Sequence, residues 1–124
     1  MDKLVFIIDD TDSVLTLCAS LLEDEYRVLT IPSAEKMFSL LEKIKPNMIV
    51  MDIEMPEMNG FEAITKLKEN PDLCGIPVLF MTGYVDETVR SRVEELGAFG
   101  IIDKEDIGEG LLDRVNRSLL ITPY

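Results

Sequence analysis

The 124-residue sequence contains no histidine and no tryptophan, and it has only two cysteines. Cys18 lies in an apolar helical pattern and Cys74 in a loop-like stretch, and no short spacing links them as metal ligands. These absences argue against a zinc centre and against a disulfide framework. We expect two free thiols, buried or incidental, as is usual in a reducing cytoplasm.

Basic residues are also few, because 12 Lys and Arg oppose 24 Asp and Glu and give a formal net charge of −12. Such a charge repels phosphate backbones and anionic lipid surfaces, which argues against direct binding of nucleic acid or of a membrane. No apolar run reaches the length of a membrane span, and the apolar segment after Lys3 is too short for a secretory signal. The sequence therefore predicts a cytoplasmic protein.

Length and composition favour one globular domain over residues 1–124, since 47% of the residues are hydrophobic. No linker, internal repeat or low-complexity segment interrupts the chain. After Leu120 only Ile-Thr-Pro-Tyr remains, so no output domain is expected in this chain.

Short apolar runs rich in β-branched residues alternate with segments of helical period. This alternation is typical of an α/β fold in which a doubly wound parallel sheet is covered by helices on both faces. We expect five short strands, at Leu4–Ile8, Arg27–Thr30, Met48–Met51, Val78–Met81 and Gly100–Ile102.

Five helices are expected between and after these strands. Asp12 is the candidate N-cap of the first helix, and the second follows Ser33 and stops before Pro46. The remaining three are expected from after Gly60 to about Asn70, from about Asp86 to Leu96, and from Ile107 to Leu119.

Polar side chains follow four of the predicted strands. Asp9 and Asp10 follow the first strand, Asp52 the third, Thr82 the fourth and Lys104 the fifth. Each alone has an ordinary explanation, such as a helix cap or a solvated surface group. Ligands of doubly wound sheets bind at the carboxyl ends of the strands, and so the joint placement predicts a functional site there.

Clustered carboxylates repel one another, by roughly 4 kcal/mol for two charges about 4 Å apart at an effective dielectric near 20. A divalent cation relieves this repulsion, and ligands that offer only oxygen favour a hard ion such as Mg²⁺. Such a site also recruits phosphate. The pattern predicts phosphoryl transfer to a carboxylate, with a lysine and a hydroxyl to balance charge on the phosphoryl oxygens.

Over nearly its whole length, the sequence resembles the receiver domain of bacterial two-component response regulators, because it contains the motifs of that family in the same order. Asp9 and Asp10 match the acidic pair of that family. Asp52, within VMDIEMPEMNG, matches its phosphoacceptor, and Thr82 and Lys104 match its conserved hydroxyl and lysine. The resemblance implies a flavodoxin-like sheet of strand order 2-1-3-4-5 with five helices.

The resemblance also implies a function. A histidine kinase or histidine phosphotransfer protein would pass a phosphoryl group to Asp52, and the domain would catalyse its own phosphorylation and dephosphorylation without being an enzyme in the ordinary sense. Mg²⁺ would be bound directly by Asp10 and Asp52, through water by Asp9, and by the backbone carbonyl of Glu54. Lys104 would pair with Asp52 and later with the phosphoryl group.

On the output side, the resemblance implies a downstream protein target that binds the face made by the fourth helix, fifth strand and fifth helix. A phosphorylation-dependent dimer is a further expectation. Two positions depart from the family pattern there. Ile101 stands where the family usually has an aromatic residue, with Phe99 nearby, and Glu105 replaces a proline that follows the lysine in a cis peptide. Because a cis bond before a non-proline residue costs about 2.5–4 kcal/mol, a trans bond and an altered loop are expected.

Two alternative functions remain open from the sequence. DTDSVL, from Asp10 to Leu15, resembles the first motif of haloacid-dehalogenase-type phosphatases, in which Asp10 would be the nucleophile. That reading leaves Asp52 without a role, and the later acidic pair of those enzymes has no match. The other alternative is a pseudo-receiver that binds partners without phosphorylation, which the departures at Ile101 and Glu105 favour and the intact site argues against.

Overall fold

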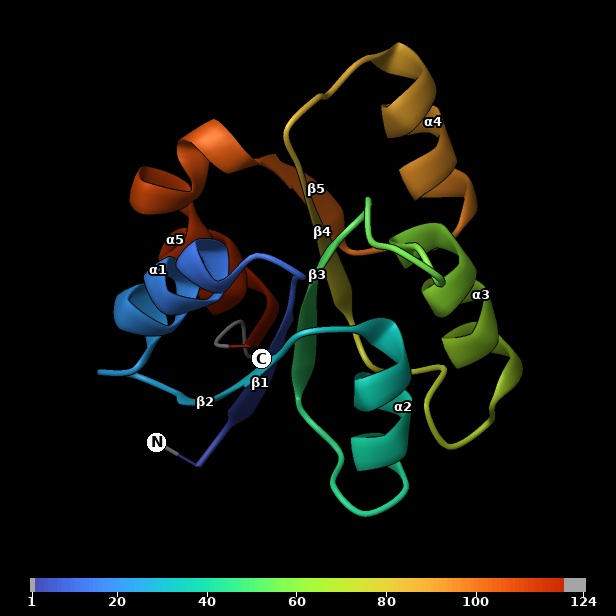
Figure 1. Ribbon diagram of the computed structural model, residues 1–124, viewed down its shortest axis with the longest axis horizontal. Coiled ribbons are helices and arrows are strands. Elements are labelled where there is room, and N and C mark those ends of the chain that lie inside the picture. The colour runs from blue at the N-terminus through green and yellow to red at the C-terminus, as the bar shows by residue number, and fades with distance from the viewer. Residues whose placement is uncertain (1, 120–124) are drawn as a thin grey trace, which may run out of the picture.

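One five-stranded parallel sheet organises the computed structural model, which describes residues 2–119 (Figure 1). The strand order is β2-β1-β3-β4-β5, as the family resemblance implies. Each strand begins at its predicted residue and ends at, or one residue beyond, its predicted end. The strands are β1 (Leu4–Ile8), β2 (Arg27–Ile31), β3 (Met48–Asp52), β4 (Val78–Thr82) and β5 (Gly100–Asp103).

Helices cover both faces of the sheet, as predicted for a doubly wound fold. In Figure 1, α1 and α5 lie together on one face, whereas α2, α3 and α4 lie on the other. A short 3-10 helix, η1, joins β5 to α5. The bounds are α1 (Asp12–Leu22), α2 (Ala34–Leu41), α3 (Gly60–Glu69), α4 (Glu87–Glu95), η1 (Lys104–Asp106) and α5 (Ile107–Leu119).

Two apolar layers pack between the sheet and the helices. Alternate residues of the central strands point to opposite faces, so that Phe6 and Phe80 contribute to the layer under α2 and α3, and Ile7 and Leu79 to the layer under α1 and α5. All residues of β1, β3 and β4 are buried. Burying one large apolar side chain contributes about 1.5–3 kcal/mol, which makes these three strands a rigid base for the residues at their carboxyl ends.

α2 follows Ser33, as predicted, whereas α1 begins one residue earlier than predicted. The Ser33 hydroxyl accepts a hydrogen bond from the amide of Lys36 at the start of α2, as expected for a cap. Asp12, however, is not the N-cap of α1. Thr11 occupies that position in extended conformation, and Asp12 is the first helical residue, where its charge still favours the positive end of the helix dipole.

The two cysteines are free, in agreement with the prediction. Cys18 is fully buried beneath the sheet edge that carries Asp9, and its Sγ atom lies 3.8 Å from the sulfur of Met81. Burial and the charge of Asp9 raise the pKa of the Cys18 thiol to about 12, so it stays protonated and unreactive. Cys74 is exposed.

None of the helices found within residues 2–119 is long and apolar enough to cross a membrane.

Candidate functional site

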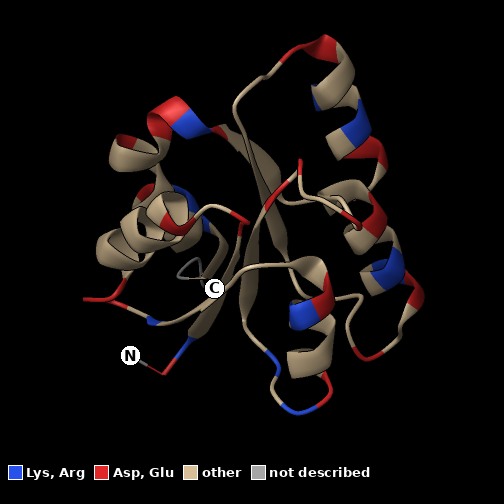
Figure 2. Cartoon of the chain, in the orientation of Figure 1, with Lys and Arg blue, Asp and Glu red and all other residues tan. Residues whose placement is uncertain are grey.

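Three carboxylates meet where β1 and β3 end. Asp9 and Asp10 follow β1 directly, and Asp52 is the last residue of β3, which pairs in parallel with β1. One oxygen from each of the three lies within 4.8 Å of the others. Figure 2 shows the acidic segments that cap these two strands at the same edge of the sheet. The sequence thus predicted their proximity correctly, because parallel strands deliver their carboxyl ends to one edge.

Lys104 reaches across this group from the end of β5. Its Nζ atom lies 3.2 Å from Oδ2 of Asp52, the pairing that the family resemblance implies. It also lies 3.0 Å from Oδ2 of Asp9, a contact that the sequence did not predict. One ammonium therefore balances two carboxylates that are almost completely removed from solvent.

Burial dominates the electrostatics of Asp52, which is 3% exposed. Desolvation and the charge of Asp9 raise its pKa to about 6, although the charge and hydrogen bond of Lys104 and a hydrogen bond from the backbone of Glu54 act in the opposite direction. Burial alone would lower the pKa of Lys104, but its hydrogen bonds and charge interactions with Asp9 and Asp52 outweigh this effect and raise it. The ammonium is thus held charged beside the carboxylates.

Asp9 is fully buried, and its two carboxylate oxygens have different partners. Its Oδ1 atom accepts a hydrogen bond of 2.8 Å from the amide of Thr11. Its Oδ2 atom faces Nζ of Lys104 at 3.0 Å and has no other partner among the described residues. A buried oxygen of this kind favours a positively charged partner, and the set of three carboxylates offers only hard oxygen ligands. The residues therefore suit a small divalent cation such as Mg²⁺.

Glu54 contributes through its backbone. Its amide donates a hydrogen bond of 3.2 Å to Oδ1 of Asp52, and its side chain is exposed. The expected role of the Glu54 carbonyl as a metal ligand stays a prediction. The amide contact nevertheless leaves one oxygen of Asp52 held by the loop and the other facing Lys104.

The hydroxyl of Thr82 lies at the end of β4 but is engaged locally. It donates to the carbonyl of Tyr84 and accepts from the amide of the same residue, both at 3.2 Å. Thr82 is buried, whereas Tyr84 is 67% exposed. The structure therefore places the hydroxyl at the predicted edge, where it would give up its bond to the carbonyl of Tyr84 in order to donate to another group.

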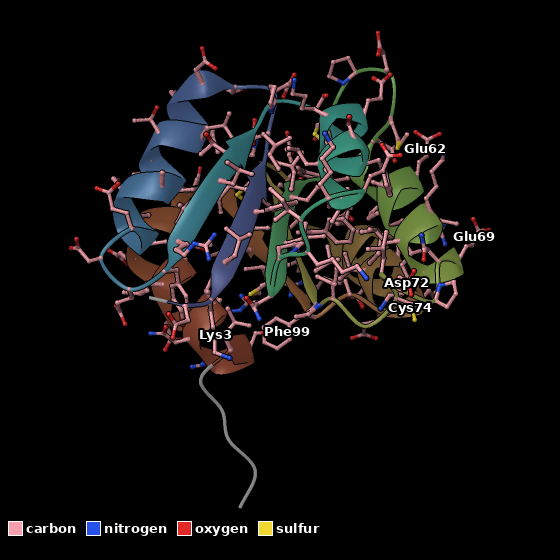
Figure 3. The ribbon with its side chains drawn as sticks, turned by 90° about the horizontal axis from the view of Figure 1, so that it is seen from below. Lys3, Glu62, Glu69, Asp72, Cys74 and Phe99 are labelled. Carbon is pink, nitrogen blue, oxygen red and sulfur yellow. The ribbon has the colours of Figure 1, made fainter. Side chains whose placement is uncertain are left out.

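The departures from the family pattern have clear structural outcomes. No peptide bond between residues 2 and 119 is cis, so the predicted trans bond before Glu105 is confirmed. Phe99 does not take the place of an aromatic ring at Ile101. Its amide pairs with the carbonyl of Val78 at the start of β4, and Figure 3 shows Phe99, like Lys3, at the edge where the strands begin, which is opposite the acidic site.

Gly60 has a role that sequence reasoning missed. Its amide donates a hydrogen bond of 2.8 Å to the carbonyl of Ile53, which docks the start of α3 onto the loop after Asp52. A Cβ atom at this position would lie 2.6 Å from the carbonyl oxygen of Asp52. Asn59 and Glu62 complete a capping box at the same helix start, a pattern that the sequence does contain.

Comparison with known proteins agrees with this geometry. A family model described as the response regulator receiver domain matches residues 5–116. The protein PilH of Pseudomonas aeruginosa is 29% identical over 116 residues, which are 93% of this chain and 96% of PilH. Protein RcaC of Microchaete diplosiphon is also 29% identical over 95% of this chain, but the chain spans only 18% of the length of RcaC.

A solved structure gives the same result for the fold. The chemotaxis protein CheY4 of Vibrio cholerae superimposes with a TM-score of 0.88 at 25% sequence identity, and the match covers 94% of this chain and 98% of that one. Nearly every element of the present structure therefore has a counterpart in a protein of similar size.

Proposed function

The chain belongs to the response regulator receiver domain family of two-component signalling, and from this premise we propose that it accepts a phosphoryl group on Asp52 in a Mg²⁺-dependent reaction and thereby switches a protein-binding face. One observation carries the proposal. Asp52 is a buried carboxylate that faces Lys104 at 3.2 Å and shares the sheet edge with two further acids. These are the features that a carboxylate nucleophile needs in phosphoryl transfer.

The proposed phosphohistidine donor lies outside the 124 residues of this sequence, which contain no histidine. In the proposed step, an oxygen of Asp52 attacks the phosphorus of a phosphohistidine on a histidine kinase or histidine phosphotransfer protein. The P–O bond to Asp52 forms as the P–N bond breaks, and the electron pair of that bond stays on the imidazole nitrogen. Lys104 then pairs with the phosphoryl oxygens in place of the Asp52 carboxylate, which has lost its charge.

Mg²⁺, when bound, would neutralise and orient the phosphoryl oxygens. Asp10 and Asp52 are the proposed direct ligands, Asp9 binds through water, and the carbonyl of Glu54 supplies a further oxygen. The cluster of three carboxylates, which offers only oxygen ligands, supports this assignment. Asp10 is exposed and therefore open to a hydrated ion.

Thr82 links the phosphoryl group to the surface. In the proposed switch its hydroxyl leaves the carbonyl of Tyr84, 3.2 Å away, and donates to a phosphoryl oxygen instead. This change releases the backbone that leads to the cap of α4, where Asp86 accepts a hydrogen bond from the amide of Val89. The β4–α4 connection would therefore shift on phosphorylation without the aromatic ring that Ile101 replaces.

The proposed partner face lies between α4, β5 and α5. A groove of about 480 Å³ opens there, lined among others by Val85, Arg90, Ile101 and Arg114. A downstream protein, or a second phosphorylated copy of the chain, is the proposed occupant. Cytoplasmic location remains a prediction.

The phosphatase alternative lacks support from the site. Lys104 contacts Asp9 and Asp52, and Asp10, the nucleophile of that reading, is the exposed member of the acidic group. Asp52, which is buried and faces Lys104, is the carboxylate better placed to attack a phosphoryl group.

Beryllofluoride, a mimic of the phosphoryl group, distinguishes an active receiver from a pseudo-receiver. With Mg²⁺ present, we expect it to shift the backbone amide signals of residues 9–10, 52–54, 82–86 and 104 in the NMR spectrum of the whole chain. Without Mg²⁺ these shifts should be absent. An unchanged spectrum in both conditions would refute phosphoryl binding, and shifts confined to residues 52–54 would refute the switch through Thr82.

The affinity for Mg²⁺ should depend on pH with a definite sign. Asp52 has a pKa of about 6 in the metal-free protein, and only the carboxylate binds metal. Binding should therefore be nearly constant above pH 7 and weaken about tenfold per pH unit below 6, as one proton competes with the ion. Calorimetric titration between pH 5 and 8 measures this. Asp72→Asn, which removes a remote exposed charge, should keep the same profile, and a flat profile in both proteins would contradict the assignment.

A further inference from the structure

Lys104 lies where the backbone changes direction sharply between β5 and η1, and its side chain extends from there to the acidic site. Asp103, the last residue of β5, is extended (φ −70°, ψ 136°), and Lys104 is already the first residue of the 3-10 helix η1. The chain therefore turns from strand to helix at the residue whose side chain holds Asp9 and Asp52. Whatever fixes this turn also fixes where the ammonium lies.

The side chain of Asp103 closes the turn. Its Oδ1 atom accepts a hydrogen bond of 2.9 Å from the backbone amide of Glu105. Because acceptor and donor belong to the residues on either side of Lys104, the bond encloses the Lys104 backbone in a small ring. On the other side, the amide of Ile107 donates to the carbonyl of Lys104, and Ile107 is buried.

The rest of the Asp103 environment is equally defined. Asp103 pairs in register with Thr82 on the neighbouring strand, so the residue before the lysine lies beside the residue that carries the hydroxyl. Asp103 is also one of the residues that line the groove containing Arg90 and Arg114. This residue thus borders both the turn at Lys104 and the groove between α4 and α5.

We propose that Asp103 is a positioning residue for Lys104: its carboxylate holds the Lys104 backbone so that Nζ meets Asp9 and Asp52. The consequence for phosphorylation rests on the proposed function of Asp52, whereas the consequence for the ammonium does not. What the bond requires is an acceptor oxygen at position 103 and an amide hydrogen at position 105. A negative charge at position 103 is not required.

A pair of variants separates the acceptor from the charge. Asp103→Ala removes the acceptor, and Asp103→Asn keeps an oxygen in the same place without the charge. In Asp103→Ala we expect the rate of Mg²⁺-dependent phosphorylation by acetyl phosphate to fall roughly tenfold, as for other losses of a positioning contact. Asp103→Asn should restore the rate to within about twofold of the unaltered chain.

The second readout is the NMR signal of the Lys104 side-chain ammonium, which is observed without metal or phosphodonor and assigned by its loss in Lys104→Arg. Exchange with water is expected to be slow in the unaltered chain and in Asp103→Asn, and fast in Asp103→Ala. This measurement tests the positioning role of Asp103 even if the unaltered chain takes up no phosphoryl group. Absence of phosphorylation in the unaltered chain would contradict the proposed function and not the role of Asp103.

Ser33→Ala is the matched control, since it also deletes a side-chain acceptor for a backbone amide at the start of a helix, but after β2, the outer strand farthest from β5. It should lower thermal stability about as much as Asp103→Ala but change neither the rate nor the ammonium signal. The proposal is overturned if Asp103→Ala leaves the Lys104 signal unchanged, if Ser33→Ala causes the same loss of rate, or if Asp103→Asn behaves like Asp103→Ala.

Discussion

Asp52→Asn is expected to abolish phosphorylation by small phosphodonors and, at the same time, to stabilise the metal-free protein. The first effect follows because an amide oxygen is a poor nucleophile and carries no charge to bind Mg²⁺. The second follows from burial, which raises the pKa of Asp52 to about 6 from an ordinary value of 3.8. At neutral pH the ionised group opposes folding, and its replacement should gain on the order of 1–3 kcal/mol.

The stabilisation should depend on pH with a sign that can be checked. Because the folded pKa is raised, the cost of ionised Asp52 is full above pH 6 and is relieved as pH falls towards 3.8. Thermal unfolding without metal should therefore show a difference between the two proteins that shrinks over this range. Asp72→Asn, which removes an exposed charge remote from the site, should retain phosphorylation and unfold like the unaltered chain. Equal stability of Asp52→Asn and the unaltered chain at every pH would show that the buried, ionised carboxylate of Asp52 does not lower the free energy of unfolding.

Gly60→Ala is expected to give the largest loss of stability among conservative substitutions near the site. The added Cβ would lie 2.6 Å from the carbonyl oxygen of Asp52, 3.0 Å from Cα of Ile53 and 2.9 Å from the ring of Phe80. Two of these atoms belong to the backbone and cannot rotate away. Overpacking of this kind costs about 1–3 kcal/mol and occasionally more, and here any relief would displace Asp52 itself.

Thermal unfolding and phosphorylation together test this expectation. Gly60→Ala should unfold at a temperature several degrees lower and accept phosphate more slowly even where it is fully folded. Gly108→Ala is the matched control, because nothing lies within 4 Å of the added Cβ at that helical position. It should leave phosphorylation unchanged and gain up to about 1 kcal/mol from helix propensity. If both variants had the same stability, the close packing of α3 on the Asp52 loop would be refuted.

The fold could be predicted from the sequence because the apolar runs are short, separate and bounded by polar residues. Each strand begins at the residue predicted for it. Four strands extend one residue beyond their predicted ends, to Ile31, Asp52, Thr82 and Asp103. The last three are polar residues that still pair in the sheet although they end the apolar pattern. The candidate site followed from the same observation, as polar groups at the ends of parallel strands must gather at one edge.

Contacts that depend on side-chain direction were beyond the sequence. The pairing of Lys104 with Asp9, the bonds of Thr82 with Tyr84 and the bond from Glu105 to Asp103 all arise from torsions that no spacing encodes. The misplaced cap at Asp12 has a similar cause. Asp9 binds the amide of Thr11 and so sets the start of α1 one residue earlier.

The most direct test of the central claim is to map the acyl phosphate after the whole chain has been incubated with Mg²⁺ and acetyl phosphate. Reductive trapping of the acyl phosphate followed by peptide mass spectrometry identifies the modified residue. We predict that the label lies on Asp52 and is lost when Mg²⁺ is removed. A label on Asp10 with none on Asp52 would contradict the account and support the phosphatase-like reading instead.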